Sequence, residues 1–273
     1  MSDNSKTTLF IGNGYDVAYG YKTSYAEFLS SPNFDYQIHN GNKLCAFIRQ
    51  QKEQNNWVDI EVCLYEYCKT IETDNEIDVT NFRRDFDYLC LEIKNYLKTA
   101  NDGINNTKLD QLQREWCAKY PSMNVISLNY TPMLQNKLQG FGFKEPIQNV
   151  HGTISYDFND ISNSIVLGID GTMKVPESCS FLYKAANNNI NIRGVKQNID
   201  LSNNYILYGC SLGVTDNWYF KNIFTRKNIE VTVYYLGQNN RNKILNRIIE
   251  MSDNNLADFK SDNNLYLIDV ATL

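Results

Sequence analysis

Polar residues and glycines follow five β-rich runs of the sequence, and their types are those that contact small ligands. In chain order they are Gly12-Asn13-Gly14, Asn129-Tyr130, His151-Gly152, Gly168-Ile169-Asp170 and Gly209-Cys210-Ser211. In an open parallel sheet, ligands bind outside the carboxyl ends of the strands. Five such strand ends in one chain therefore predict a ligand site at one edge of a parallel sheet.

The first of these groups has two interpretations. Gly12 and Gly14 allow a phosphate to approach the backbone, or they simply form a tight turn. The dinucleotide pattern GxGxxG is incomplete, because Val17 stands where a third glycine is expected. Asp16, two residues further on, is suited either to cap the following helix or to bind a ribose hydroxyl.

His151 and Asn129 are the candidates for chemistry. His151 is one of only two histidines, and an imidazole at a strand end can titrate near neutral pH. The alternative is a structural histidine. Asn129 offers both a donor and an acceptor, or it is a turn residue. Asp216 either contacts the ligand or begins a helix.

These groups need a sheet to bring them together. Near-continuous apolar runs alternate with helical segments, which predicts a Rossmann-like α/β fold with a mostly parallel sheet and helices on both faces. Thr7 to Ile11 is expected to be a central strand. The further expected strands are Asn124–Leu128, Ile147–Val150, Ser164–Leu167, Tyr205–Tyr208, Val231–Leu236 and Leu265–Ile268.

Between about residues 44 and 97 the apolar spacing becomes helical. We therefore expect one domain over residues 1–273, with a mainly helical insertion at about 40–120. The stretch from Glu53 to Glu92 holds eleven Asp and Glu against three Lys and Arg. Such a face is either solvated or a docking surface for a protein partner.

The charge, the apolar stretches and the cysteines of the chain exclude several classes of partner and site. The chain has 273 residues and a net charge of −5, without a long basic run, so nucleic acid is not an expected partner. No signal-peptide pattern and no bilayer-spanning apolar stretch is present, so a cytoplasmic protein without membrane attachment is expected. Seven cysteines without a CxxC pair predict core thiols rather than disulfides or zinc, and no metal site is expected.

At the same positions the sequence resembles a known family, the AbiH family of phage abortive-infection proteins. The resemblance rests on Leu9–Ala18 with Thr23-Ser24-Tyr25 and Phe28-Leu29, on Trp57–Glu61, and on Leu128–Thr131, Val150–Gly152, Leu167–Asp170 and Tyr208–Asp216, in this order. It covers residues 7 to about 225. Cys210 departs from the pattern, because many members are expected to have histidine there.

The order of these motifs is also similar, more distantly, to sirtuin-like NAD-binding proteins. The zinc cysteines and the Pro-Asp-Phe-Arg segment of sirtuins are missing, which argues against protein deacylation. The resemblance implies that NAD is the substrate or ligand and that hydrolysis of its nicotinamide–ribose bond is possible. It implies His151 as general base, with Asn129 orienting water and the ribose. It implies that the ligand contacts Gly12, Asn13, Gly14, Asp16, Tyr130, Gly209, Ser211 and Asp216.

Three hypotheses follow. The first is an NAD-consuming phage-defence protein, and the second is a nucleotide sensor that signals through a protein partner without catalysis. The third is a nuclease effector, which is weakened because no acidic cluster with metal-binding spacing accompanies the strand ends. An active NAD hydrolase would harm its own host, so an off state is expected, held by the acidic insertion through a regulatory partner or a homo-oligomer.

Overall fold

A computed structural model describes residues 6–54, 59–71, 76–99, 103–154, 165–187 and 191–273. Its centre is a six-stranded, all-parallel sheet in the order β3-β2-β1-β4-β5-β6. The strands are β1 (Lys6–Ile11), β2 (Asn124–Ser127), β3 (Ile147–Asn149), β4 (Ser202–Tyr208), β5 (Glu230–Tyr235) and β6 (Asn264–Asp269). The prediction of a Rossmann-like parallel sheet with a central first strand is confirmed.

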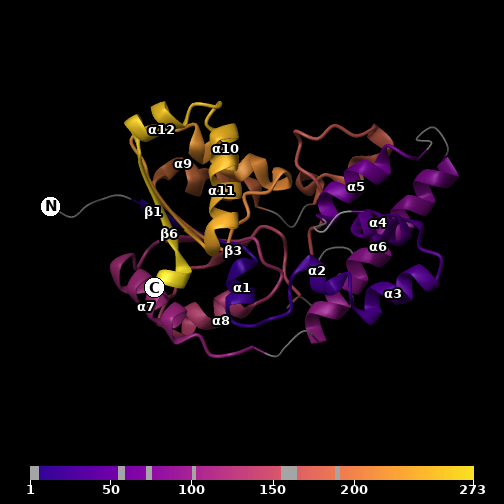
Figure 1. Cartoon of the computed structure of the whole chain (residues 1–273), viewed down its shortest axis with the longest axis horizontal. Coiled ribbons are helices and arrows are strands. Elements are labelled where there is room, and N and C mark those ends of the chain that lie inside the picture. Colours follow the sequence, from indigo (N-terminus) through magenta and orange to yellow (C-terminus); the bar gives the residue numbers. More distant parts are fainter. Residues whose placement is uncertain (1–5, 55–58, 72–75, 100–102, 155–164, 188–190) are drawn as a thin grey trace.

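Helices cover both faces of this sheet (Figure 1). The helices packed on the sheet are α1 (Gly14–Ala18), α7 (Thr107–Lys119), α8 (Met133–Gly140), α9 (Ile192–Leu201), α10 (Asn217–Phe224), α11 (Gly237–Met251) and α12 (Leu256–Asp262). The alternating direction of the side chains along β1 explains why helices pack on both faces of the sheet. Phe10 packs with α9 to α12, whereas Leu9 and Ile11 pack with α1, α7 and α8. Successive side chains of a strand point to opposite faces, so a fully apolar strand serves two cores.

The chain between β1 and β2 contributes a group of helices beside the sheet (Figure 1). They are α2 (Tyr25–Phe28), α3 (Pro32–His39), α4 (Lys43–Gln54), α5 (Ile60–Cys68) and α6 (Glu76–Thr99). Their buried faces form a core of their own, centred on residues such as Leu44, Leu64 and Leu89. We call these five helices the helical layer. Trp57 and Val58 of the Trp57–Glu61 motif, and Glu72 of the acidic stretch, lie outside the described residues.

One predicted strand is wrong. Ser164 lies outside the described residues, and Ile165 forms only an isolated antiparallel bridge with Gly152. The apolar side chains of Ile165 and Leu167 are buried in the core of the helical layer instead. The prediction that this run is buried is thus correct for Ile165–Leu167. These described residues, however, pair with no strand of the sheet. Two short 3₁₀ helices follow it, η1 (Glu177–Leu182) and η2 (Lys184–Ala186).

The strand order has a direct consequence for ligand binding. From β1 the chain builds β2 and β3 on one side of the sheet and β4, β5 and β6 on the other. The direction of strand addition therefore reverses between β1 and β4. In doubly wound sheets of this order, the crevice at the carboxyl ends beside that reversal is where ligands bind. Two more 3₁₀ helices, η3 (Val214–Asp216) and η4 (Val270–Thr272), follow β4 and β6.

None of the helices in the described ranges combines the length and the apolar character that crossing a membrane requires.

Candidate functional site

A cavity of about 450 Å³ lies at the carboxyl ends of β1, β2 and β4. This volume falls in the range of small-molecule sites. We call it the site cavity. It is lined by all ten residues to which we assigned a catalytic or ligand-binding role, namely Gly12, Asn13, Gly14, Asp16, Asn129, Tyr130, His151, Gly209, Ser211 and Asp216. The structure thus brings these residues together, and their roles in binding or catalysis stay predictions.

The three glycines have a structural explanation. The turn after β1 lies directly against the turn after β4, and the amide of Gly14 donates to the carbonyl of Gly209 at 3.0 Å. A Cβ on Gly12 would lie 2.5 Å from the Gly209 oxygen, and one on Gly14 would lie 2.7 Å from the Gly209 Cα. Gly209 has a φ of +64°, which favours glycine. The glycines therefore let two strand-end turns meet, and a bound phosphate is not needed to explain them.

Asp16 is at the centre of a buried polar cluster beside these turns. Its carboxylate accepts hydrogen bonds from Asn129 Nδ2 at 2.9 Å and from Thr131 Oγ1 at 2.6 Å. Burial raises the pKa of Asp16 to about 6, although both hydrogen bonds act in the opposite direction. Asp16 lies within α1 and does not cap it, because Asn13 is the N-cap. The capping interpretation of Asp16 is therefore wrong.

Asn129 has one side-chain polar atom that forms no hydrogen bond within the described structure. Its Nδ2 donates to Asp16, but among the described residues its buried Oδ1 has no hydrogen-bond partner. A buried acceptor without a partner costs free energy, which a ligand or water with a donor group recovers. Asn129 also lines the site cavity. This residue is thus prepared to accept a hydrogen bond from a ligand hydroxyl or a water.

A second buried cluster holds His151. Its Nε2 lies 2.9 Å from Asp216 Oδ1, and Lys184 Nζ lies 2.7 Å from the same oxygen. Burial alone would raise the pKa of Asp216, but the Lys184 ammonium and His151 hold that pKa well below its ordinary value. Asp216 is the N-cap residue of α10, yet its side chain does not cap the helix. The carboxylate is therefore available to hold His151.

The helical layer reaches this cluster through Glu61 of α5. Glu61 Oε2 accepts from Lys184 Nζ at 2.9 Å and from Thr215 Oγ1 at 2.6 Å, and its Oε1 accepts from the Gly168 amide at 3.2 Å. Lys184 and Glu61 are each about 5 % exposed. Burial alone would lower the pKa of Lys184, but Asp216 and Glu61 hold it above its ordinary value. The lysine is consequently a permanent cation here.

The charged side chains that line the site cavity, within the described ranges, are all carboxylates. They are Asp16, Asp59, Glu61 and Asp216. Asp59 caps α5 through hydrogen bonds to the amides of Glu61 and Val62. Burial and the neighbouring Glu61 raise the pKa of Asp59 to about 6. Near neutral pH the cavity therefore has an acidic lining, with the Lys184 ammonium behind it.

The other predicted residues play smaller parts in the geometry. Asn13 accepts a hydrogen bond from Thr23 Oγ1 at 2.6 Å. The ring of Tyr130 lies beside the His151 ring, with centroids 6.0 Å apart. Ser211 is exposed. Burial raises the pKa of the Cys210 thiol far above its ordinary value, so this cysteine cannot act as a base in place of histidine.

Asp170 was expected at a strand end, but it does not line the site cavity. It accepts from the Trp218 amide at 3.1 Å and thereby supports the start of α10.

Sequence reasoning missed Lys184, and it noted Thr131 and Thr215 only as members of motifs. No strand of the sheet directly precedes Lys184, and its partners lie 31 to 123 residues away in the chain. Glu61 was noted only as part of a motif. In the described part of the chain, no three His, Cys, Asp or Glu side chains form a metal-binding group. The Lys184 ammonium lies instead between the carboxylates of Glu61 and Asp216.

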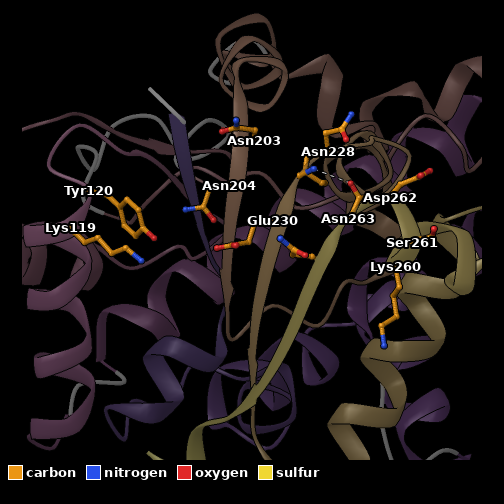
Figure 2. A pocket seen from close by; sticks show the side chains of 12 residues that line it. Lys119, Tyr120, Asn203, Asn204, Asn228, Glu230, Lys260, Ser261, Asp262 and Asn263 are labelled. Carbon is orange, nitrogen blue, oxygen red and sulfur yellow. Dashed lines mark hydrogen bonds between the residues drawn. The ribbon is translucent and has the colours of Figure 1, made fainter. Parts of the chain in front are cut away.

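A second cavity, of about 630 Å³, opens at the amino ends of β4, β5 and β6, at the opposite end of the strands (Figure 2). Asparagine side chains surround it, together with charged residues such as Lys119, Glu230 and Lys260. One of its amides, Asn263, is used internally, because it accepts from the Ile229 amide and donates to the Arg226 and Phe259 carbonyls. No residue singled out from the sequence lines this cavity. The site cavity at the carboxyl ends is thus the better candidate.

Comparison with known proteins agrees with the motifs that line the site cavity. No curated protein sequence matches the chain. The family described as bacteriophage abortive infection AbiH matches residues 8–235, a range that runs from β1 to the end of β5 and includes every residue of the site described above. The chain therefore belongs to the AbiH family of bacteriophage abortive-infection proteins.

Proposed function

We propose that the protein contributes to phage defence by binding NAD or a related nucleotide in the site cavity and hydrolysing its nicotinamide–ribose bond. The observation that carries this proposal is the acidic lining of a cavity at the reversal point of a Rossmann-like sheet. The position suits a nucleotide. The charge suits a ribose that becomes positive as its bond to nicotinamide breaks.

The chemistry divides between the two buried clusters. Water attacks the anomeric carbon of the ribose, and the electrons of the carbon–nitrogen bond pass to nicotinamide, which leaves as a neutral molecule. His151 takes the proton of the water, as a general base does. Asn129 Oδ1 accepts a hydrogen bond from that water or from a ribose hydroxyl. Asp16, when ionised, stabilises the positive charge that develops on the sugar.

The remaining contacts follow from the lining of the cavity. In the bound nucleotide the pyrophosphate lies at the turn from Gly12 to Gly14 and the adenosine ribose at Ser211. Carboxylates repel a pyrophosphate, so the acidic clusters suit the nicotinamide ribose rather than the phosphates. Tyr130 and Gly209 complete the wall around the ligand.

A sensor that binds the nucleotide without cleaving it is the alternative. It is favoured by one observation: His151 Nε2 already has two polar neighbours, Asp216 and Lys184. A mass spectrum of the nucleotide retained on the purified protein, combined with an assay for free nicotinamide, separates the two functions. A sensor retains the nucleotide intact and releases no nicotinamide.

Replacing His151 tests the catalytic assignment. A general base contributes about 10²–10⁴-fold, so His151→Ala should lower the rate of nicotinamide release by this factor. His39→Ala is the matched control, because His39 is exposed and bonds only to the Asp35 carbonyl in the described structure. Circular dichroism checks folding. Undiminished release by a folded His151→Ala variant would remove His151 from the mechanism.

A further inference from the structure

The position of the proton on His151 follows from the hydrogen bonds of Lys184. A lysine ammonium has three N–H donors and no acceptor. Three oxygen atoms lie within reach of Lys184 Nζ: Asp216 Oδ1 at 2.7 Å, Glu61 Oε2 at 2.9 Å and the Thr215 carbonyl at 3.3 Å. These three oxygens equal in number the three donors of the ammonium, and the Thr215 carbonyl competes for the third donor with His151 Nε2, 3.2 Å from Nζ.

His151 Nε2 has two polar neighbours. It lies 3.2 Å from Lys184 Nζ and 2.9 Å from Asp216 Oδ1. The ammonium can only donate and the carboxylate can only accept. If the three donors of Lys184 go to the three oxygens, Nε2 carries the proton and donates it to Asp216. In the neutral ring the lone pair then resides on Nδ1.

We propose that Asp216 is a positioning residue that fixes His151 in the tautomer with its proton on Nε2, so that Nδ1 is the basic atom. Lys184 and Glu61 support Asp216 in this role. Lys184 keeps Asp216 an anion, and Glu61 takes the lysine donor that would otherwise reach Nε2. Glu61 belongs to α5, so the helical layer takes part in setting the state of a residue at the sheet. The catalytic consequence rests on the proposed function, whereas the tautomer does not.

The groups around the imidazole all agree with this assignment. Asp216 comes from η3, Lys184 from η2, and Glu61 from α5 through Lys184. Tyr130 packs its ring beside the imidazole from the end of β2. Fixing one tautomer by a buried carboxylate is how enzymes prepare histidine as a base, and losing that carboxylate leaves the wrong tautomer, at a cost of about 10⁴-fold in kcat in a serine protease.

Nitrogen NMR of the imidazoles tests the tautomer directly and without a ligand. The chain has only two histidines, so a His39→Gln variant assigns the spectrum. With a neutral ring, the wild-type signal of His151 should show Nε2 as the protonated nitrogen and Nδ1 as the bare one. The ring-proton correlations identify each nitrogen. A wild-type ring with its proton on Nδ1 would overturn the proposal.

Variants then test the cause. In Asp216→Asn the amide donates to Nε2, so the proton should move to Nδ1. In Lys184→Met the carboxylate of Asp216 remains, so the tautomer should stay as in the wild type. If Lys184 donated to Nε2 instead, Lys184→Met would change the tautomer, and that result would also refute the proposal. Glu66→Gln, an exposed change on α5, the helix that carries Glu61, is the control and should leave the tautomer unchanged.

The NMR result is independent of activity. If the tautomer is as proposed and nicotinamide is never released, the proposed function fails and the tautomer assignment stands. If nicotinamide is released and the proton lies on Nδ1, the tautomer assignment fails and the proposed function stands. Where both are correct, kcat of Asp216→Asn should fall by about 10²–10⁴-fold.

Discussion

Asp16 is the residue whose burial has the clearest consequence for stability. Its pKa is about 6 in the folded protein, above the ordinary value of 3.8. Between these pH values the folded state binds more protons than the unfolded state, so the free energy of unfolding falls as pH rises. The stabilisation is present below pH 4 and is lost above pH 6.

Asp16→Asn removes this dependence on pH. Relative to the wild type, the free energy of unfolding of the variant should rise by up to about 3 kcal/mol between pH 4 and pH 7. Urea unfolding of both proteins at the two pH values measures the difference. Other groups that titrate in this range, such as Asp59, are common to both proteins and cancel. Equal pH dependence of the two proteins would show that Asp16 is not buried as described.

Gly12 shows a different effect at the residue scale, the contact of two backbones. Gly12→Ala places a Cβ against the Gly209 oxygen and the Cys210 Cα. Because neither atom belongs to a flexible side chain, the variant should lose about 1–3 kcal/mol of stability. Gly140→Ala is the control, since a Cβ there meets no atom within 4 Å. Thermal unfolding compares the two, and an equally stable Gly12→Ala would contradict the packing of the turns.

At the scale of elements, the link between α5 and η2 is a buried ion pair. Glu61→Gln or Lys184→Met alone leaves an unpaired buried charge, which typically costs about 3–5 kcal/mol. The double variant removes both charges of the pair. Its loss in the free energy of unfolding should therefore be smaller than the sum of the losses of the two single variants. A double-mutant cycle with urea unfolding measures the coupling. Additive losses would mean that the two side chains do not interact as the structure describes.

The elements also show how far sequence reasoning extends. Six of the seven expected strands form the sheet, because fully apolar runs such as Tyr205–Tyr208 have few alternatives to a buried strand. Ile165 and Leu167 are equally apolar, but the sequence does not reveal that their burial is against the helical layer. Long-range packing decides such cases, and periodicity carries no information about it.

The same limit applies to the site. Residues at the ends of strands were predictable, since parallel strands bring their carboxyl ends to one edge of the sheet. Lys184 begins the short 3₁₀ helix η2, follows no strand of the sheet and therefore has no such signal. Its importance comes from partners on three other segments, namely Glu61, His151 and Asp216. A charged residue of this kind is recognised only when the fold has brought its partners together.

At the scale of the whole molecule, the helical layer forms one wall of the site cavity through Asp59, Glu61 and Leu97. That it holds the protein in an inactive state stays a hypothesis, which its place beside the cavity makes testable. Holding two states at 99:1 takes only about 2.7 kcal/mol. A surface contact of this layer with a second copy or a regulatory protein is sufficient for that.

Charge reversal on the exposed face of this layer tests the regulatory hypothesis. Glu66 and Glu76 are exposed, and Glu66 pairs only with Lys69 in the described structure. The double variant Glu66→Lys and Glu76→Lys should raise toxicity in growing cells or change the particle size, with up to about 100-fold more active protein. Toxicity, expression and particle size equal to the wild type would leave the layer as scaffold only.

Release of nicotinamide from NAD by the purified protein tests the central claim most directly. Even a protein held at 99:1 keeps about 1 % in the active state, so a long incubation suffices to detect turnover. The account predicts equal amounts of nicotinamide and ADP-ribose from the wild type, with production lowered by about 10²–10⁴-fold in His151→Ala. Intact NAD after incubation with wild type and with the charge-reversed variant alike would contradict it.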